Sequence, residues 1–273
     1  MDIQITKMHG IGNSYVIIED IDRALEPKYT ALAKLISDKN FGIGSDGILV
    51  VNKGRLAKYW MRVFNPDGSE AEKSGNGIRM FARYLYDKKL ISNESDIEVG
   101  GRHGGQIVRP RITSDKSVTV NMGKGEILEK EIIVVEEMEF NGIRVSVGNP
   151  HFVIFAKNEK EADAYAKKYG SAIENHGAFS PARTNVEFVS VPDKRKIFVS
   201  VWERGAGLTL SSGTGSCAAA FAAFKENRIE NKVTVKLAGG DLMIEIRNDD
   251  SVLMTGPAEY IFSGAVDLDK LLK

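Results

Sequence analysis

The chain has 273 residues, of which 42% are hydrophobic and 27% are charged, as in an ordinary soluble globular protein. Lysine plus arginine equals aspartate plus glutamate at 37 each, which gives no support to a nucleic-acid or anionic-membrane partner. No apolar run approaches the roughly 20 residues that cross a bilayer. The single cysteine, Cys217, allows no intrachain disulfide, and the four histidines lack metal-ligand spacing. We therefore expect a cytoplasmic protein without a metal site.

Short runs rich in β-branched and aromatic residues predict strands along the whole chain. In chain order they cover 15–18, 48–51, 59–64, 118–121, 145–147, 152–155, 186–191 and 197–202. Apolar residues at helical spacing predict helices over 29–38, 77–87, 159–169 and 216–227. The last of these is almost uncharged before Lys225, so we expect it to be buried on all sides. Many strands with few helices indicate an α+β protein.

The chain repeats itself once, with matching features in the same order. The matched segments are Gly12-Asn13 with Gly148-Asn149, Phe64-Asn65 with Trp202-Glu203, Ser74-Gly75-Asn76-Gly77 with Ser212-Gly213-Thr214-Gly215, and the glycine-rich hairpins at 97–101 and 235–240. Each half closes with a similar strand, at 117–123 and at 251–256. These matches predict two pseudo-equivalent halves that meet near residue 115, with the last dozen residues returning to the first half.

Each Ser-Gly-x-Gly segment stands where a helix is expected to begin. Glycine lets the backbone approach a ligand closely, and the free N–H groups and dipole of a first helical turn favour an anion. One such segment usually marks only a capped helix start, but two symmetric ones predict two helix ends that converge on one cleft. The motifs of phosphate-binding loops and of serine hydrolases are absent. Such symmetry suits the removal of a proton from one face of a carbon and its return to the other face.

Seven longer segments lie between residue 7 and about residue 217. They are KMHGIGN at 7–13, FGIGSDG at 41–47, FNPDGSE at 64–70, GNGIR at 75–79, GNPH at 148–151, RTNV at 183–186 and ERGAG at 203–207. Together they resemble the signature segments of the diaminopimelate epimerase family. The resemblance implies two pseudo-symmetric domains, each a curved, mostly antiparallel sheet wrapped around a central apolar helix. We place them at 1–114, with 262–273 returning, and at 115–261, with the active site in the cleft between them.

The resemblance also implies a function and its site residues. The family interconverts LL- and meso-diaminopimelate, as homodimers and without pyridoxal phosphate, with one cysteine as base and another as acid. Those cysteines align with Ser74 and Ser212 of this chain; Cys217, inside the apolar helix, does not replace them. His151 would support Ser74, and Glu203 would support Ser212. The residues expected to bind the substrate are Asn13, Asn65, Gly75, Asn76, Asn149, Asn185, Glu203, Arg204, Gly213 and Thr214.

Two departures from the family's pattern stand out. Gly47 occupies a position where some members have glutamine, and Leu208 occupies one where glutamate is common. The two serines matter more, because an alkanol is several units less acidic than a thiol and a hydroxyl is a poor general base. We therefore expect a chain that binds substrate and epimerises it very slowly or not at all. The double change has two explanations: a deliberate Cys→Ser substitution, or a natural variant whose serines have other support.

Two alternatives compete with this interpretation. One is a related cofactor-independent racemase or epimerase for histidine, lysine or hydroxyproline. The Glu203-Arg204 pair and the asparagines favour diaminopimelate, because a site built for two charged ends rejects ligands that lack one of them. The other alternative is a non-catalytic amino-acid binder, which the missing thiols favour.

Overall fold

The computed structural model describes residues 2–71, 74–101 and 105–272, and the chain divides into two compact units. Unit 1 contains the residues up to Val120 and those from Gly256 onward, and unit 2 contains Asn121–Thr255. Each unit is built from a sheet and few helices, so the predicted α+β class is confirmed. The chain passes between the units at Val120 and at Gly256, whereas the predicted limits were 114 and 262.

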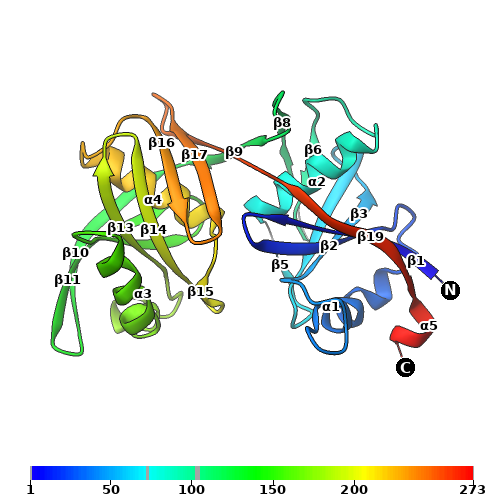
Figure 1. Ribbon diagram of the computed structural model, residues 1–273, viewed down its shortest axis with the longest axis horizontal. Coiled ribbons are helices and arrows are strands. Elements are labelled where there is room, and N and C mark those ends of the chain that lie inside the picture. The colour runs from blue at the N-terminus through cyan, green and yellow to red at the C-terminus, as the bar shows by residue number, and fades with distance from the viewer. Residues whose placement is uncertain (1, 72–73, 102–104, 273) are drawn as a thin grey trace. The chain divides into compact units, whose positions relative to one another are not determined.

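Unit 1 contains one sheet in the order β19-β1-β2-β3-β4-β6-β7, with β5 beside β4 (Figure 1). Its elements are β1 (Asp2–Gly10), β2 (Asn13–Glu19), α1 (Tyr29–Ser37), β3 (Ile48–Lys53), β4 (Tyr59–Phe64), β5 (Glu70–Ala71), α2 (Gly75–Asp87), β6 (Ile97–Val99), β7 (Gln106–Val108), β8 (Arg111–Ile112), β19 (Glu259–Asp267) and α5 (Leu268–Leu271). Strand β9 (Val118–Lys124) leads from unit 1 into unit 2.

Unit 2 contains the strand order β10-β11-β12-β13-β14-β16-β17-β18-β9, with β15 beside β14. Its remaining elements are β10 (Glu126–Val135), β11 (Met138–Ser146), β12 (Pro150–Phe155), α3 (Glu159–Glu174), β13 (Asn185–Asp193), β14 (Lys196–Glu203), β15 (Gly207–Thr209), α4 (Gly213–Lys225), β16 (Lys232–Leu237), β17 (Gly240–Ile246) and β18 (Ser251–Gly256). Both sheets are mostly antiparallel, as predicted.

The two units repeat one topology. In unit 1, β2–β3 and β4–β6 are parallel, whereas β1–β2, β3–β4, β4–β5 and β6–β7 are antiparallel. In unit 2 the strands numbered ten higher have the same pairings: β12–β13 and β14–β16 are parallel, and β11–β12, β13–β14, β14–β15 and β16–β17 are antiparallel. Helices α1 and α3 occupy the first crossover, and α2 and α4 occupy the second. The pseudo-symmetry predicted from the repeat is therefore present in the fold.

The central strands of each sheet, such as β3, β4 and β13, are buried on both faces, because a helix packs on each. In β3, Ile48 and Val50 belong to the core that contains α1, whereas the side chain of Leu49 lies beside Gly77 at the start of α2. Successive side chains of a strand point to opposite faces, so the alternation assigns one face to α1 and the other to α2. In β13, Val186 and Phe188 likewise belong to the core around α3.

The central helices follow the predicted apolar pattern. Ile78, Phe81, Ala82 and Leu85 of α2 are all fully buried. In α4 every residue from 215 to 223 is buried, which agrees with the expectation of a helix enclosed on all sides. Within the described ranges, no helix is both long and apolar enough to cross a membrane.

Two sequence-based boundaries need correction, and three strands were missed. Helix α3 continues to Glu174 rather than ending at 169, because Gly170 allows the Trp202 ring to pack on the helix and Ile173 extends the buried stripe. The predicted strand 145–147 is only the end of β11, which stops at Ser146 before the positive φ of Gly148. Strands β1, β10 and β19 were not predicted from the sequence, and two of them, β10 and β19, lie at a sheet edge.

Candidate active site

The two Ser-Gly-x-Gly segments have nearly the same geometry. Ser74 (φ −136°, ψ 117°) caps α2, and its Oγ accepts a hydrogen bond of 3.0 Å from the Gly77 N–H. Ser212 (φ −133°, ψ 121°) caps α4 and accepts one of 3.2 Å from the Gly215 N–H. A serine oxygen at the cap satisfies one of the free N–H groups of the first turn. Both serines therefore stand at a helix N-terminus, and α2 and α4 each have 13 residues.

Ser74 has a second contact, with a residue not predicted from the sequence. The Tyr15 hydroxyl donates a 3.3 Å hydrogen bond to Ser74 Oγ. Tyr15 is buried and belongs to β2, next to the positive-φ residue Gly47. A Cβ at Gly47 would lie 2.3 Å from the Phe64 carbonyl oxygen and 3.0 Å from the Tyr15 ring. Glycine at 47, one of the two departures noted above, is therefore required by this arrangement.

Asn13 and Asn76 lie together near the start of α2. The Asn76 amide donates to Asn13 Oδ1 at 3.1 Å, and the Asn13 amide donates to Asp46 Oδ2 at 3.1 Å. Asp46 also accepts a 2.7 Å hydrogen bond from the Ser14 N–H. Because Asp46 accepts from the Asn13 amide, it sets which way that amide faces. The predicted residue Asn65 lies in the turn after β4, where its amide donates to Ser69 Oγ at 3.0 Å.

Ser212 lies beside a carboxylate. Its hydroxyl donates a 3.1 Å hydrogen bond to Glu203 Oε2, and Thr209 donates a 2.6 Å hydrogen bond to Glu203 Oε1. Glu203 ends β14, and Thr209 ends the short strand β15 that pairs with it. Ser212 is buried, with 2% of its surface exposed. The two serines thus differ: Ser212 can pass its proton toward a base, whereas Ser74 accepts from a phenol.

His151 is fully buried between two acceptors. Its Nδ1 lies 2.7 Å from Glu187 Oε1, and its Nε2 lies 3.0 Å from Asn149 Oδ1. The Asn149 amide lies 3.5 Å from the hydroxyl of Thr214, in the first turn of α4. These contacts form a chain of polar groups from β13 through β12 to the helix start.

Glu187 is the most unusual group in unit 2. Its side chain has no exposed surface, and burial raises the pKa of its carboxyl above the ordinary value, although the charge and hydrogen bond of His151 oppose that shift. Its second oxygen, Oε2, has no hydrogen-bond partner among the described residues. A buried carboxylate oxygen without a partner is costly, so its presence calls for a functional explanation.

Asn185 and Arg204 form a second polar group in unit 2. The backbone N–H of Arg204 donates to Asn185 Oδ1 at 3.0 Å, and the Asn185 amide donates to the Pro150 carbonyl at 2.9 Å. Asn185 faces His151 across the parallel strands β12 and β13. The Arg204 guanidinium donates to the Ala182 carbonyl at 2.7 Å. A planar guanidinium of this kind can hold a carboxylate through two parallel hydrogen bonds.

The cysteine, the second departure from the family's pattern and the histidines were also noted in the sequence. Cys217 is buried within α4, as expected. Leu208, the second departure, lies in β15 with 45% of its surface exposed. Among the described residues there is no cluster of three or more potential metal ligands, and His103 lies outside those residues.

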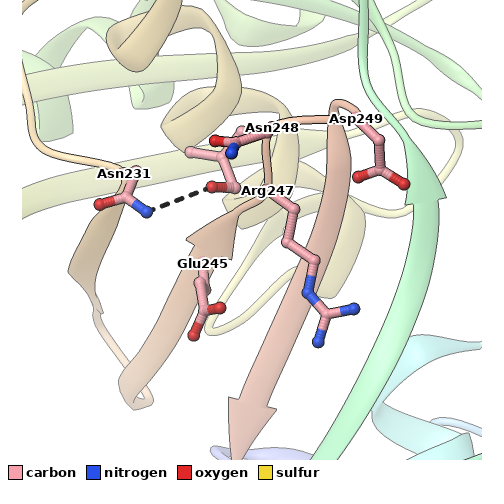
Figure 2. Close-up of a pocket in the computed structure, with 6 residues that line it drawn as sticks. Asn231, Glu245, Arg247, Asn248 and Asp249 are labelled. Atoms are coloured by element: carbon pink, nitrogen blue, oxygen red, sulfur yellow. Dashed lines mark hydrogen bonds between the residues drawn. The ribbon is translucent and has the colours of Figure 1, made fainter.

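A surface pocket lies at the turn between β17 and β18. Figure 2 shows its lining, which consists of Asn231, Glu245, Ile246, Arg247, Asn248 and Asp249. The Asn231 amide points to the Ile246 carbonyl at 3.5 Å. None of the predicted site residues lines this pocket, so we do not assign the function to it.

Four polar neighbours of the candidate residues were missed from the sequence: Tyr15, Asp46, Glu187 and Thr209. Asp46 lies inside the 41–47 segment noted above, and Glu187 had a signal of its own. It is a charged residue inside the apolar run 186–191, in a strand whose two faces are both buried. A charge in such a strand is rare unless it is paired, which would have marked it as a candidate.

Comparison with known proteins identifies the family. Residues 5–128 and 143–261 match the family model described as diaminopimelate epimerase. The protein named diaminopimelate epimerase from Desulfitobacterium hafniense is 42% identical over 98% of this chain and 100% of its own length. The one so named from Methanococcus maripaludis is 39% identical over 97% of this chain and 100% of its own length.

Solved structures share the fold at low sequence identity. A phenazine biosynthesis protein of the PhzF family from Bacillus anthracis has a TM-score of 0.74 at 14% identity, covering 98% of this chain and 100% of that one. A hydroxyproline epimerase from Agrobacterium vitis has a TM-score of 0.68 at 14% identity, covering 98% and 93%. These structures show the architecture alone. On the evidence of the family model and the full-length relatives, the chain belongs to the diaminopimelate epimerase family.

Proposed function

We propose that this chain is an isomerase of the diaminopimelate epimerase type, with LL- and meso-2,6-diaminopimelate as its substrates. Support comes from the family match, which spans most of the chain, and from full-length relatives of about 40% identity that carry this name. Because the family interconverts these two compounds, we place the activity in the biosynthesis of lysine and of peptidoglycan precursors.

The reaction needs one acid/base group on each face of the α-carbon. One group removes the α-proton as the carbon becomes planar, and the other returns a proton to the opposite face, so no electrons are gained or lost. Negative charge passes onto the substrate carboxylate in between, and helix N-terminal N–H groups stabilise such charge. We assign the two positions to Ser74 and Ser212, where the family has its cysteines, with His151 and Glu203 as supporting groups.

The serines make this chain a weak or inactive epimerase. A neutral hydroxyl is a much poorer acid and base than a thiol. Each Oγ also accepts a hydrogen bond from its own helix, from Gly77 N–H in one case and Gly215 N–H in the other. We retain both origins for the serines, a deliberate Cys→Ser pair and a natural variant with other support.

The substrate carries an ammonium and a carboxylate at its distal end as well as at the reacting centre. We assign recognition of that end to Asn13, Asn65, Asn149, Asn185, Glu203 and Arg204. Gly75, Asn76, Gly213 and Thr214, in the first turns of α2 and α4, are assigned to the carboxylate at the reacting carbon. An amino acid without the distal groups would leave these polar residues unsatisfied, which supports diaminopimelate over histidine, lysine or hydroxyproline.

The observation that carries the proposal is the matched pair of helix starts. Two serines with nearly equal backbone angles, each capping a 13-residue apolar helix, stand at equivalent points of a repeated topology. Capping alone does not explain why both are followed by Gly-x-Gly. A two-base reaction does, because it needs the same small side chain and the same free N–H groups twice.

We further propose that the chain is a cytoplasmic homodimer. Strand β19 is the edge of the unit 1 sheet, so its outer backbone groups are open to pairing. Tyr260, Ile261 and Phe262 on this strand are 42%, 50% and 41% exposed. Consecutive apolar side chains on an open edge strand are typical of a surface that a second copy covers.

The test is exchange of the α-proton of LL-diaminopimelate in D2O, followed by NMR. The samples are this chain and its Ser74→Cys/Ser212→Cys double variant. We expect fast exchange and epimerisation by the double variant and slow or no exchange by the unaltered chain. Absence of exchange in both, at saturating substrate, would refute the epimerase assignment.

A second candidate function is binding without turnover, because both hydroxyls are already engaged in hydrogen bonds. It predicts that calorimetry with the unaltered chain detects tight binding of diaminopimelate, while the double variant gains no exchange. A panel with histidine, lysine and hydroxyproline then distinguishes a binder of diaminopimelate from a racemase for another amino acid.

A further inference from the structure

Glu187 lies on the face of the unit 2 sheet that α4 covers. Its neighbours in β13, Val186 and Phe188, point into the core around α3, so Glu187 points the other way. A Cβ built on Gly215 would lie 2.9 Å from Glu187 Oε1 and 3.0 Å from Ser212 Oγ. Glu187 Oε1 and Ser212 Oγ therefore both lie close to Gly215 at the start of α4. The Glu187 carboxylate is thus beside a candidate catalytic position.

Stability of the fold does not explain the buried pair of Glu187 and His151. Removing a carboxylate and its partner from water costs more than their attraction returns unless every polar atom is satisfied. Here Glu187 Oε2 is left without a partner among the described residues. An apolar pair of similar volume would fill the space between β12, β13 and α4 at less cost. The buried charge is thus better explained by what it does to His151.

Glu187 determines which nitrogen of His151 carries a proton. A carboxylate only accepts hydrogen bonds unless it is protonated, so the 2.7 Å contact requires a proton on Nδ1 when Glu187 is ionised. The second contact, of Nε2 with Asn149 Oδ1 at 3.0 Å, also faces an oxygen. A doubly protonated ring satisfies both contacts. In either protonation state of Nε2, the carboxylate fixes the proton on Nδ1 and the plane of the ring.

We propose that Glu187 is a positioning residue that holds His151 with its proton on Nδ1 and its Nε2 directed to Asn149. The unit of Glu187, His151 and Asn149 then extends to Thr214 in the first turn of α4. Glu203 is the other charged group that acts on Glu187, and its like charge opposes ionisation there. In this role Glu187 exchanges no proton with Ser74 or Ser212 and does not contact the substrate. It acts only through His151.

The first test is the tautomer of His151 in the ligand-free chain, read from the imidazole nitrogen signals by NMR at neutral pH. Only four histidines are present, and a His151→Asn variant assigns the signal. We expect a proton on Nδ1 of His151 in the unaltered chain. In Glu187→Leu, which keeps much of the volume but has no acceptor, we expect Nδ1 to lose its proton and Nε2 to carry one.

A matched control uses another buried carboxylate of unit 2. Glu174 accepts hydrogen bonds from Trp202 and Arg183, at 2.8 and 2.7 Å. Among the described residues, His151 is joined to Glu187 and Asn149 and not to Glu174. Glu174→Gln is expected to leave the His151 nitrogen signals unchanged. If the unaltered chain has no proton on Nδ1, or if Glu187→Leu leaves the tautomer as it was, the proposed role of Glu187 is wrong.

The catalytic consequence rests on the proposed epimerase function, whereas the tautomer does not. In the Ser74→Cys/Ser212→Cys background, adding Glu187→Leu is expected to lower kcat for α-proton exchange roughly 100-fold with little change in KM, the size of a lost acid/base contribution. A change confined to KM would overturn the positioning role in catalysis. If that background shows no exchange at all, the epimerase assignment fails while the tautomer result still decides the structural claim.

Discussion

The phenol of Tyr15 donates a hydrogen bond of 3.3 Å to Ser74 Oγ, the oxygen that also caps α2. This bond is longer than the common O–H···O distance of about 2.7–2.8 Å, so we expect it to be weak. A double-mutant cycle of Tyr15→Phe and Ser74→Ala, measured by urea unfolding, should give a coupling free energy of about 0.5 kcal/mol. The same cycle of Tyr15→Phe with Ser92→Ala serves as a control and should be additive. Additivity in both cycles would show that the phenol and Ser74 do not interact in solution.

Glu203 is expected to matter through its charge rather than its size. It accepts hydrogen bonds from Ser212 at 3.1 Å and Thr209 at 2.6 Å. In the Ser74→Cys/Ser212→Cys background, Glu203→Gln should lower kcat for α-proton exchange by about 100-fold or more, because the nearby base is lost. Thr209→Val removes one hydrogen bond to the same carboxylate but leaves its charge, and should have a much smaller effect. Equal losses in the two variants would contradict a charge-dependent role.

Asp46 is expected to control ligand affinity through Asn13. Its carboxylate accepts from the Asn13 amide at 3.1 Å and from the Ser14 N–H at 2.7 Å. Asp46→Ala frees the Asn13 amide to turn, so we expect binding of diaminopimelate, measured by calorimetry on the unaltered serine background, to weaken about tenfold, the loss of roughly one good hydrogen bond. Asp115→Ala, in the turn between β8 and β9 where the carboxylate accepts a hydrogen bond from the Ser117 N–H, tests for a general effect of removing a surface carboxylate. An unchanged affinity in Asp46→Ala would argue against the assignment of Asn13 to the ligand.

The loop after α1 should depend on pH through Asp38. The backbone N–H groups of Phe41 and Asn40 donate to its carboxylate, both at 2.7 Å, and hold its pKa below the ordinary value. A lowered pKa in the folded state means that the ionised carboxylate adds stability above its unfolded pKa of about 3.9, and that this stability is lost as the pH falls through the lower folded value.

The unfolding free energies of the unaltered chain and Asp38→Ala should therefore differ at neutral pH and converge below about pH 4. Urea titrations at several pH values provide the measurement. Asp38→Asn keeps an acceptor without a charge, so its difference from Asp38→Ala should stay nearly constant with pH. A difference between the unaltered chain and Asp38→Ala that is constant down to low pH would contradict the role of the ionised carboxylate.

The proposed dimer can be tested at β19. Ile261 is 50% exposed on this edge strand, and a lysine there places a charge on the apolar surface. We expect sedimentation velocity to show a dimer for the unaltered chain and a monomer for Ile261→Lys. Met243→Lys is the control, because Met243 is 36% exposed on β17, which is paired on both sides. A monomeric unaltered chain, or dissociation by both variants, would refute β19 as the interface.

The fold was predictable where the sequence repeats itself. The matched Ser-Gly-x-Gly segments at 74–77 and 212–215, and the apolar pattern that follows each, led to α2 and α4 and to two matching halves. The edge strands β10 and β19 were missed, because their exposed apolar residues do not alternate with polar ones as in a strand with one buried face. Local pattern carries no information about which distant strand will pair with β1.

The candidate site was predictable only in part, for a related reason. Ser74, Ser212 and Glu203 lie within short, distinctive segments. Tyr15, Asp46 and Glu187 meet their partners 59, 33 and 36 residues away along the chain. Such contacts arise from strand register and from the side of the sheet that each residue faces, and both are fixed only when the sheet forms.

The pairing of β1 with β19 also orders events during translation. Unit 2 is one continuous stretch, so all of its strands from β10 to β17 have been synthesised before β19 is made. Strand β1 is made before any strand of unit 2, yet its neighbour on one side is supplied by residues that follow unit 2, where Ile3 pairs with Val266. Domains tend to fold as they are synthesised. Unit 1 starts before unit 2 and is therefore completed only after it, and until then its sheet has an open edge at β1.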